Sequence, residues 1–153
     1  MKAILISGFA KTGKTTTCNL LKDKIEKRRG GYQLIFDGLP SSKKEIRSIY
    51  KIDNNYIAIS SLGDSWNCVE DGFNVLLNEA TNKGIELDII FFTSRTKGNN
   101  YKGAISLAKK VDPDYYNFFS NEIQAVPTPV AKLESQKSRF LDFILDTSGV
   151  TYI

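Results

Sequence analysis

A short run near the start of the chain combines glycines, a lysine and hydroxyl side chains at a spacing suited to binding phosphate. Residues 8–15 read Gly-Phe-Ala-Lys-Thr-Gly-Lys-Thr. Gly8 and Gly13 allow tight turns, so that successive main-chain N–H groups converge on one anion. The Lys14 ammonium can reach phosphate oxygens, and the Thr15 hydroxyl is an oxygen ligand that suits Mg²⁺. The run therefore predicts an anion site built largely from main chain.

The segments on either side of this run are expected to place it where a strand ends and a helix begins. Residues 3–6 are apolar, which favours a central strand covered on both faces, and residues 16–29 are compatible with a helix. The positive end of that helix would point at the same anion. The residues expected to contact a nucleotide are Gly8, Ala10, Lys11, Thr12, Gly13, Lys14, Thr15 and Thr16.

This G-x-x-x-x-G-K-[ST] run, set between a strand and a helix, resembles the Walker A motif of the P-loop NTPase superfamily. The resemblance rests on Gly8, Gly13, Lys14 and Thr15. It implies a nucleoside triphosphate, with ATP as the default, together with Mg²⁺.

Apolar runs and turn signals beyond this motif predict alternating strands and helices. Strands are expected over residues 2–7, 32–36, 56–60 and 87–92, with an aromatic segment at 115–123 as the fifth. Helices are expected over residues 13–29, 67–83 and 101–110, and from Thr128-Pro129 to Gly149. This alternation predicts a single domain spanning residues 1–153, with a five-stranded, mainly parallel sheet in a three-layer αβα fold.

One further helix is expected between the second and third strands. Ser42-Lys43-Lys44-Glu45 fits a capping box, in which the serine and glutamate side chains satisfy free main-chain N–H groups. Ile46, Ile49 and Tyr50 follow at a spacing that would place them on the inner face of a short helix. Asp53-Asn54-Asn55 then predicts a turn.

Two acids are candidates for work beside the phosphate site, because ligands of parallel sheets gather at the carboxyl ends of the strands. Asp64 follows the third predicted strand and is the expected Mg²⁺ ligand alongside Thr15; its alternative role is to cap the helix that follows. Asp37 ends the second predicted strand and competes for the metal role. An ordinary turn at Asp37-Gly38 is the other interpretation.

Asp37-Gly38 also resembles part of the Asp-Gly-Asp sequence found after the second strand of small P-loop kinases such as the adenylylsulfate kinases. Leu39 stands in place of the second acid. The resemblance implies that Asp37 orients the acceptor hydroxyl or takes its proton.

The polar segment Thr93–Asn100 is the best candidate for a mobile lid. In small P-loop kinases, lid cations neutralise charge on the transferred phosphoryl group. The planar guanidinium of Arg95 suits that task better than the ammonium of Lys97. Arg95 is therefore predicted to be catalytic, together with Lys14 and Asp37.

Composition excludes several other classes of protein. The chain has no histidine, which excludes a His-based catalytic triad, and its two cysteines lack the spacing of a zinc site. No apolar run approaches a membrane span, so a cytoplasmic location is expected. The net charge is +4, yet few aromatic residues interleave with the basic clusters, so nucleic-acid binding is possible without being favoured.

Two functions remain open from the sequence. The first is an ATP-dependent phosphotransferase, a kinase acting on a small molecule or a nucleotide. The second is a nucleotide-dependent switch resembling the partition-type ATPases of the ParA/MinD group, which acts through a protein partner and could form dimers. That group has a lysine directly after the first glycine of the motif, where this chain has Phe9. A module that holds nucleotide without turnover is a third interpretation.

Overall fold

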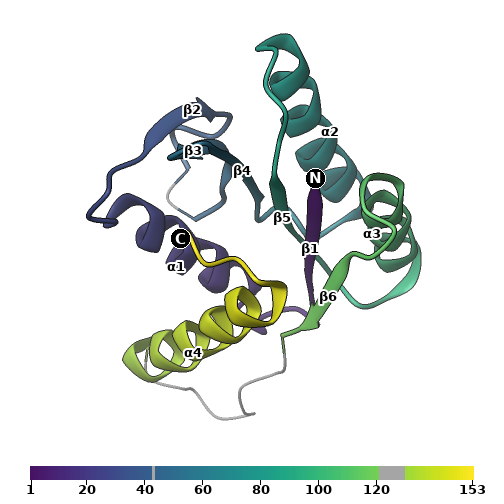
Figure 1. The fold of residues 1–153 in the computed structure, drawn as a ribbon. Coiled ribbons are helices and arrows are strands. Elements are labelled where there is room, and N and C mark those ends of the chain that lie inside the picture. The colour runs from purple at the N-terminus through teal and green to yellow at the C-terminus, as the bar shows by residue number, and fades with distance from the viewer. Residues whose placement is uncertain (43, 121–129) are drawn as a thin grey trace.

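The computed structural model describes residues 1–42, 44–120 and 130–153, which form one sheet and the helices that cover it (Figure 1). Its elements are β1 (Lys2–Ser7), α1 (Lys14–Glu26), β2 (Gln33–Asp37), β3 (Arg47–Ile52), β4 (Asn55–Ser60), α2 (Trp66–Asn82), β5 (Ile89–Ser94), α3 (Gly98–Val111), β6 (Tyr116–Phe119) and α4 (Val130–Ser148). The α/β class predicted from the sequence is confirmed.

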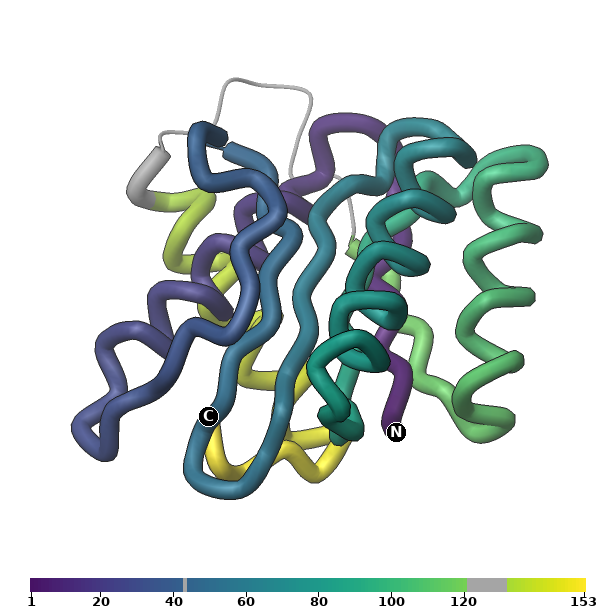
Figure 2. Tube along the Cα trace, turned by 90° about the horizontal axis from the view of Figure 1, so that it is seen from above, coloured from purple at the N-terminus to yellow at the C-terminus, as the bar shows by residue number. Residues whose placement is uncertain are grey.

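The sheet has six strands in the order β2-β3-β4-β5-β1-β6. The strands β4, β5, β1 and β6 are parallel neighbours, whereas β3 is antiparallel to both β2 and β4. The prediction of five mainly parallel strands was therefore wrong in number, and the sheet is mixed. The carboxyl ends of the parallel strands meet at the upper edge in Figure 2, where the segment after β1 also lies.

The additional strand is β3, where the sequence predicted a short helix. Ser42 does accept hydrogen bonds from the main-chain N–H groups of Lys44 and Glu45, so the local turn of a capping box is present. The chain after it is extended, because its buried side chains alternate between the two faces of the sheet. Tyr50 packs into the apolar cluster on one face and Ile49 into the cluster on the other.

Helices cover both faces of the sheet and divide the core in two. On one face, α1 and α4 pack over Ile4 and Ile6 of β1; on the other, α2 and α3 pack over Ala3 and Leu5. Strand β1 is thus buried on both faces, which explains its unbroken apolar sequence. This three-layer arrangement fixes the end of β1 firmly, and the glycine-containing run at residues 8–15 starts there.

Several element boundaries differ from prediction by a few residues, and one difference matters for function. The expected lid at Thr93–Asn100 is mostly regular structure: β5 extends to Ser94 and α3 begins at Gly98, which leaves only residues 95–97 as loop. The expected helix N-cap at Thr128-Pro129 and the end of the predicted strand at 115–123 lie outside the described residues.

Candidate phosphate site

The segment after β1 folds into a loop whose main chain is shaped for an anion. Lys11 has a φ of 60° and Gly13 a φ of 81°, so left-handed residues flank Thr12. Such alternation turns successive N–H groups toward one side of the chain. Gly13 is the N-cap of α1 and has no side chain that could cap the helix, and the first turn of α1 contains no acidic residue. The positive end of α1 is therefore not neutralised by the helix itself.

The loop is held from behind by the residue that follows β6. The Ser120 main-chain N–H donates to the Ser7 carbonyl at 2.7 Å, and the Ser120 hydroxyl donates to the Thr12 carbonyl at 2.6 Å. A Cβ at Gly8 would lie 2.6 Å from the Ser120 carbonyl oxygen, so only glycine allows this approach. Gly8 is thus required by packing, in addition to any role in turning the loop.

Lys14 folds back over the loop that precedes it. Its ammonium donates to the carbonyls of Gly8, at 3.1 Å, and Phe9, at 2.6 Å, and the side chain is buried. Burial lowers the pKa of Lys14; the negative charge of Asp64 opposes this shift and the positive charge of Arg95 adds to it. Among the described residues, no carboxylate accepts a hydrogen bond from the Lys14 ammonium, which contacts main-chain carbonyls of the loop instead.

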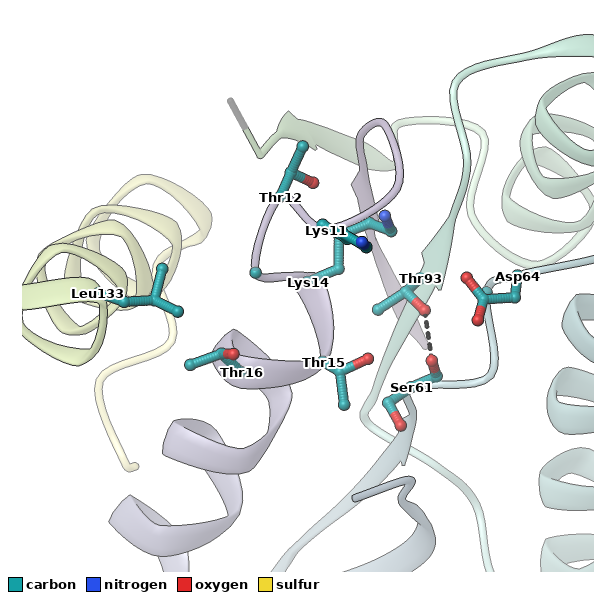
Figure 3. A pocket seen from close by; sticks show the side chains of 11 residues that line it. Lys11, Thr12, Lys14, Thr15, Thr16, Ser61, Asp64, Thr93 and Leu133 are labelled. Carbon is teal, nitrogen blue, oxygen red and sulfur yellow. Dashed lines mark hydrogen bonds between the residues drawn. The ribbon is translucent and has the colours of Figure 1, made fainter. Parts of the chain in front are cut away.

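A cavity of about 340 Å³ opens in front of this loop, within the size range of small-molecule sites (Figure 3). The loop and the first turn of α1 form one wall, and the segment after β4 and the end of β5 form the other. Its lining residues are Lys11, Thr12, Gly13, Lys14, Thr15, Thr16, Ser61, Gly63, Asp64, Thr93 and Leu133.

Asp64 lies across the cavity from Thr15, as Figure 3 shows. The cap of α2 is Ser65, whose hydroxyl accepts from the Cys68 N–H at 3.2 Å, so the sequence alternative that made Asp64 the cap was wrong. The Asp64 carboxylate instead pairs with Arg95 at 3.3 Å. Both side chains are substantially exposed, so this ion pair is weak and its partners can separate at little cost.

The wall that carries Asp64 is fixed by close packing against the end of β5. Thr93 donates from its hydroxyl to the Ser61 carbonyl at 2.9 Å, and the Arg95 N–H donates to the Gly63 carbonyl at 3.2 Å. A Cβ at Gly63 would lie 2.4 Å from the Thr93 hydroxyl oxygen and 2.9 Å from its main chain. Glycine is therefore needed to bring this segment against β5 and Asp64 to the cavity.

A second, smaller cavity of about 220 Å³ lies on the other side of the ion pair. It is lined by Phe9, Ala10, Arg95, Thr96 and Lys97. Phe9 is half exposed, and the Lys97 ammonium lies 5.4 Å from the centre of its ring, which is a cation–π distance. Arg95 thus lines one cavity while it contacts an acid that lines the other.

The structure brings most of the sequence-predicted residues together, with Asp37 as the exception. Lys11, Thr12, Gly13, Lys14, Thr15, Thr16 and Asp64 line the larger cavity, Ala10 and Arg95 line the smaller one, and Gly8 supports the loop. Asp37 ends β2 at the same edge, but β3, β4 and β5 separate it from β1. At about 4.8 Å per strand, that distance is roughly 19 Å.

Asp37 also has a local role that accounts for its presence. Its carboxylate accepts a hydrogen bond from the Leu39 N–H at 3.0 Å, as in an ordinary Asx turn. Asp37 lines neither of the two cavities beside the loop. The sequence placed it at the correct edge of the sheet, but β3, which was mistaken for a helix, occupies the space between Asp37 and the cavity.

Several residues near the loop were not assigned to the site from the sequence, among them Ser61, Glu45 and Lys137. Ser61 lines the cavity and donates from its hydroxyl to Glu45, whose carboxylate reaches the cavity wall because β3 begins at this edge. Lys137 lies on α4, and in the sequence it looks like any other charged residue of an amphipathic helix. Only the packing of α4 against α1 brings its side chain to Gly13.

The donor set suits Mg²⁺ better than a transition metal. Mg²⁺ is commonly held by one or two protein oxygens together with substrate phosphates. The Thr15 hydroxyl and the Asp64 carboxylate, which line the same cavity, are such oxygens. Among the residues that the structure describes, no group of three or more His, Cys, Asp or Glu side chains lies close enough together to hold a metal ion by itself.

Comparisons of the chain with family models, curated proteins and solved structures gave no significant match. Within the described ranges, no helix has both the length and the apolar character needed to cross a membrane. The function must therefore be inferred from the geometry of the site.

Proposed function

We propose that this chain is a P-loop protein that binds ATP with Mg²⁺ and transfers the γ-phosphoryl group to a small molecule or a nucleotide. The observation that carries the proposal is the cavity lined by six consecutive residues, 11–16, with Asp64 on the opposite wall. A left-handed glycine as the N-cap of a helix and a buried lysine both favour a polyphosphate there.

The residues of the cavity support a division of roles. The main-chain N–H groups of the loop bind phosphate oxygens, and the Lys14 ammonium exchanges loop carbonyls for phosphate. Thr15 and Asp64 would hold Mg²⁺, which when bound neutralises phosphate charge and so favours attack at phosphorus. Because catalysis of this kind depends on position and charge, it requires no covalent intermediate on the protein.

The smaller cavity supports transfer to an acceptor rather than hydrolysis alone. It adjoins the loop at Phe9 and Ala10, and its wall includes Arg95, which already contacts Asp64. An acceptor bound there would lie beside the phosphate site, and the guanidinium could leave Asp64 to meet charge on the transferred group. Asp37 has no part in this proposal.

The test is a phosphotransfer screen on purified protein, with radiolabelled ATP, Mg²⁺ and a panel of nucleosides, nucleotides and sugars. We expect label to appear in one acceptor class and to be lost in Arg95→Ala. Acceptor-independent phosphate release accompanied by ATP-induced dimers would instead support the switch ATPase. Absence of both transfer and hydrolysis would contradict catalysis and leave a nucleotide-binding module.

A further inference from the structure

Lys137 is a second buried lysine behind the phosphate loop. Only 3% of its surface is exposed, although lysine is among the residues least often buried. It lies on α4 one helical turn after Leu133, which lines the cavity, so the two share a face of the helix. A lysine at such a site requires a physical explanation, because burying an ammonium costs free energy.

The Lys137 side chain makes two kinds of contact with the loop. Its ammonium donates to the Ser120 hydroxyl at 2.8 Å, and that hydroxyl donates in turn to the Thr12 carbonyl at 2.6 Å. Its methylene chain packs on Gly13, where a Cβ would lie 2.5 Å from Lys137 Cε. The hydrogen bonds and the packing together fix Thr12 and Gly13, the two residues that precede α1.

The charge of Lys137 also reaches the phosphate site. Burial, with a smaller contribution from the charge of Lys14, lowers the pKa of Lys137 to about 8. The ammonium is therefore mainly protonated at neutral pH, close enough to Lys14 for the two charges to repel. A polyphosphate anion at the loop would offset that repulsion. Without such an anion, the ring of Phe140 provides cation–π stabilisation, because its centre lies 5.1 Å from the Lys137 ammonium.

We propose that Lys137 is a positioning residue of the phosphate site, which fixes Thr12 and Gly13 from behind and adds a positive charge that strengthens polyphosphate binding. This inference rests on the proposed function, because it assumes that the loop binds phosphate. It extends the site from the loop motif to α4, which is distant in sequence.

The experiment compares wild type with Lys137→Met, which keeps much of the methylene packing and removes the charge. Ser120→Ala keeps the charge and removes the hydroxyl that links it to Thr12. Lys109→Met, at an exposed position on α3, is the control for net charge. Binding of inorganic pyrophosphate and of ATP–Mg²⁺ is measured by calorimetry, and exchange of the amide hydrogens of residues 9–16 is measured without ligand.

We expect Lys137→Met to weaken binding of both probes by roughly tenfold or more, as loss of a nearby charge in a partly buried site predicts. Lys109→Met should match wild type. Amide exchange in the ligand-free loop should accelerate in both Lys137→Met and Ser120→Ala, with weaker binding in Ser120→Ala than in wild type.

Wild-type affinity and wild-type exchange in Lys137→Met would overturn the inference while leaving the proposed function intact. If wild type binds neither probe, the proposed function fails, and so does the role of the Lys137 charge in binding. If loop amides in that case still exchange faster in Lys137→Met than in wild type, the positioning of the loop by Lys137 would stand. A Lys137→Met protein that does not fold leaves Ser120→Ala to decide, and unchanged exchange and affinity in that variant would refute positioning.

Discussion

At the scale of single residues, two carboxylates that look alike in the sequence have different environments. Asp64 lines the cavity opposite Thr15. Asp37 lies at the end of the distant strand β2, where its carboxylate accepts a hydrogen bond from the Leu39 N–H. Asp37 ends one strand and Asp64 follows another at the same edge of the sheet, and both were candidate Mg²⁺ ligands. The packing of the strands between them, and not their local sequence, distinguishes them.

This difference predicts the outcome of a matched pair of substitutions. Asp64→Asn removes the charge of the proposed Mg²⁺ ligand, so the Mg²⁺ concentration needed for ATP binding should rise roughly ten- to hundredfold. Asp37→Asn makes the same chemical change outside the cavity and should leave the Mg²⁺ requirement as in wild type. Titration of ATP binding against Mg²⁺ by calorimetry measures both. Equal effects from the two variants would contradict the assigned metal site.

Lys137 predicts a pH dependence of stability. Its pKa is about 8 in the folded protein and 10.5 in the absence of burial, so between these values the unfolded chain binds more protons. The free energy of unfolding of wild type, relative to Lys137→Met, should therefore rise as the pH increases from about 8 to about 10.5. Urea unfolding of both proteins at pH values inside and below this window measures the difference. A relative stability that is constant or falls with pH would refute a buried, charge-penalised ammonium.

At the scale of the elements, β3 is the one whose type was predicted wrongly from the sequence, as a short helix. The buried residues Ile46, just before β3, and Ile49 and Tyr50, within it, fit a helical spacing, and they fit a strand buried on both faces equally well. The two-residue turn at Asp53-Asn54, with Asp53 at a φ of 52°, was the available signal for a hairpin. Periodicity alone could not decide between the two, because neighbouring strands and both helical layers cover β3 in the folded protein.

The strand assignment predicts how the hairpin responds to truncation. Ile52 of β3 is fully buried in the cluster beneath α1 and α4, so Ile52→Ala should lower the free energy of unfolding by about 2–5 kcal/mol. Leu34 of β2 is nearly half exposed, and Leu34→Ala should cost about 0.5 kcal/mol or less. Chemical denaturation provides both values. Similar values for the two variants would mean that β3 is not an interior strand.

At the scale of the whole molecule, the fold explains which parts of the site could be predicted. The loop and its setting come from residues that are adjacent in sequence, so local pattern was sufficient to find Gly13, Lys14 and Thr15. The contributions of Ser61, Glu45 and Lys137 depend on strand order and on the packing of α4 against α1. No local pattern contains that information.

The same dependence shows that the surroundings of the loop come from more than one layer of the fold. Strand β1 is held by β5 on one side and β6 on the other, and the segments that follow these two strands provide Arg95 and Ser120. Helix α4 reaches the loop from the α1 face of the sheet (Figure 1). The sheet and the layer of α1 and α4 thus both provide residues that lie beside the loop.

The most direct test of the central claim is calorimetric titration of purified protein with ATP–Mg²⁺, in wild type and in Lys14→Ala. Removal of the ammonium takes away a charge-assisted hydrogen bond to phosphate, worth about 1.5–3 kcal/mol, so affinity should fall roughly ten- to hundredfold. Lys109→Met controls for net charge and should bind as wild type does. Unchanged affinity in Lys14→Ala, or no binding by wild type, would contradict the assignment of residues 8–16 as a triphosphate site.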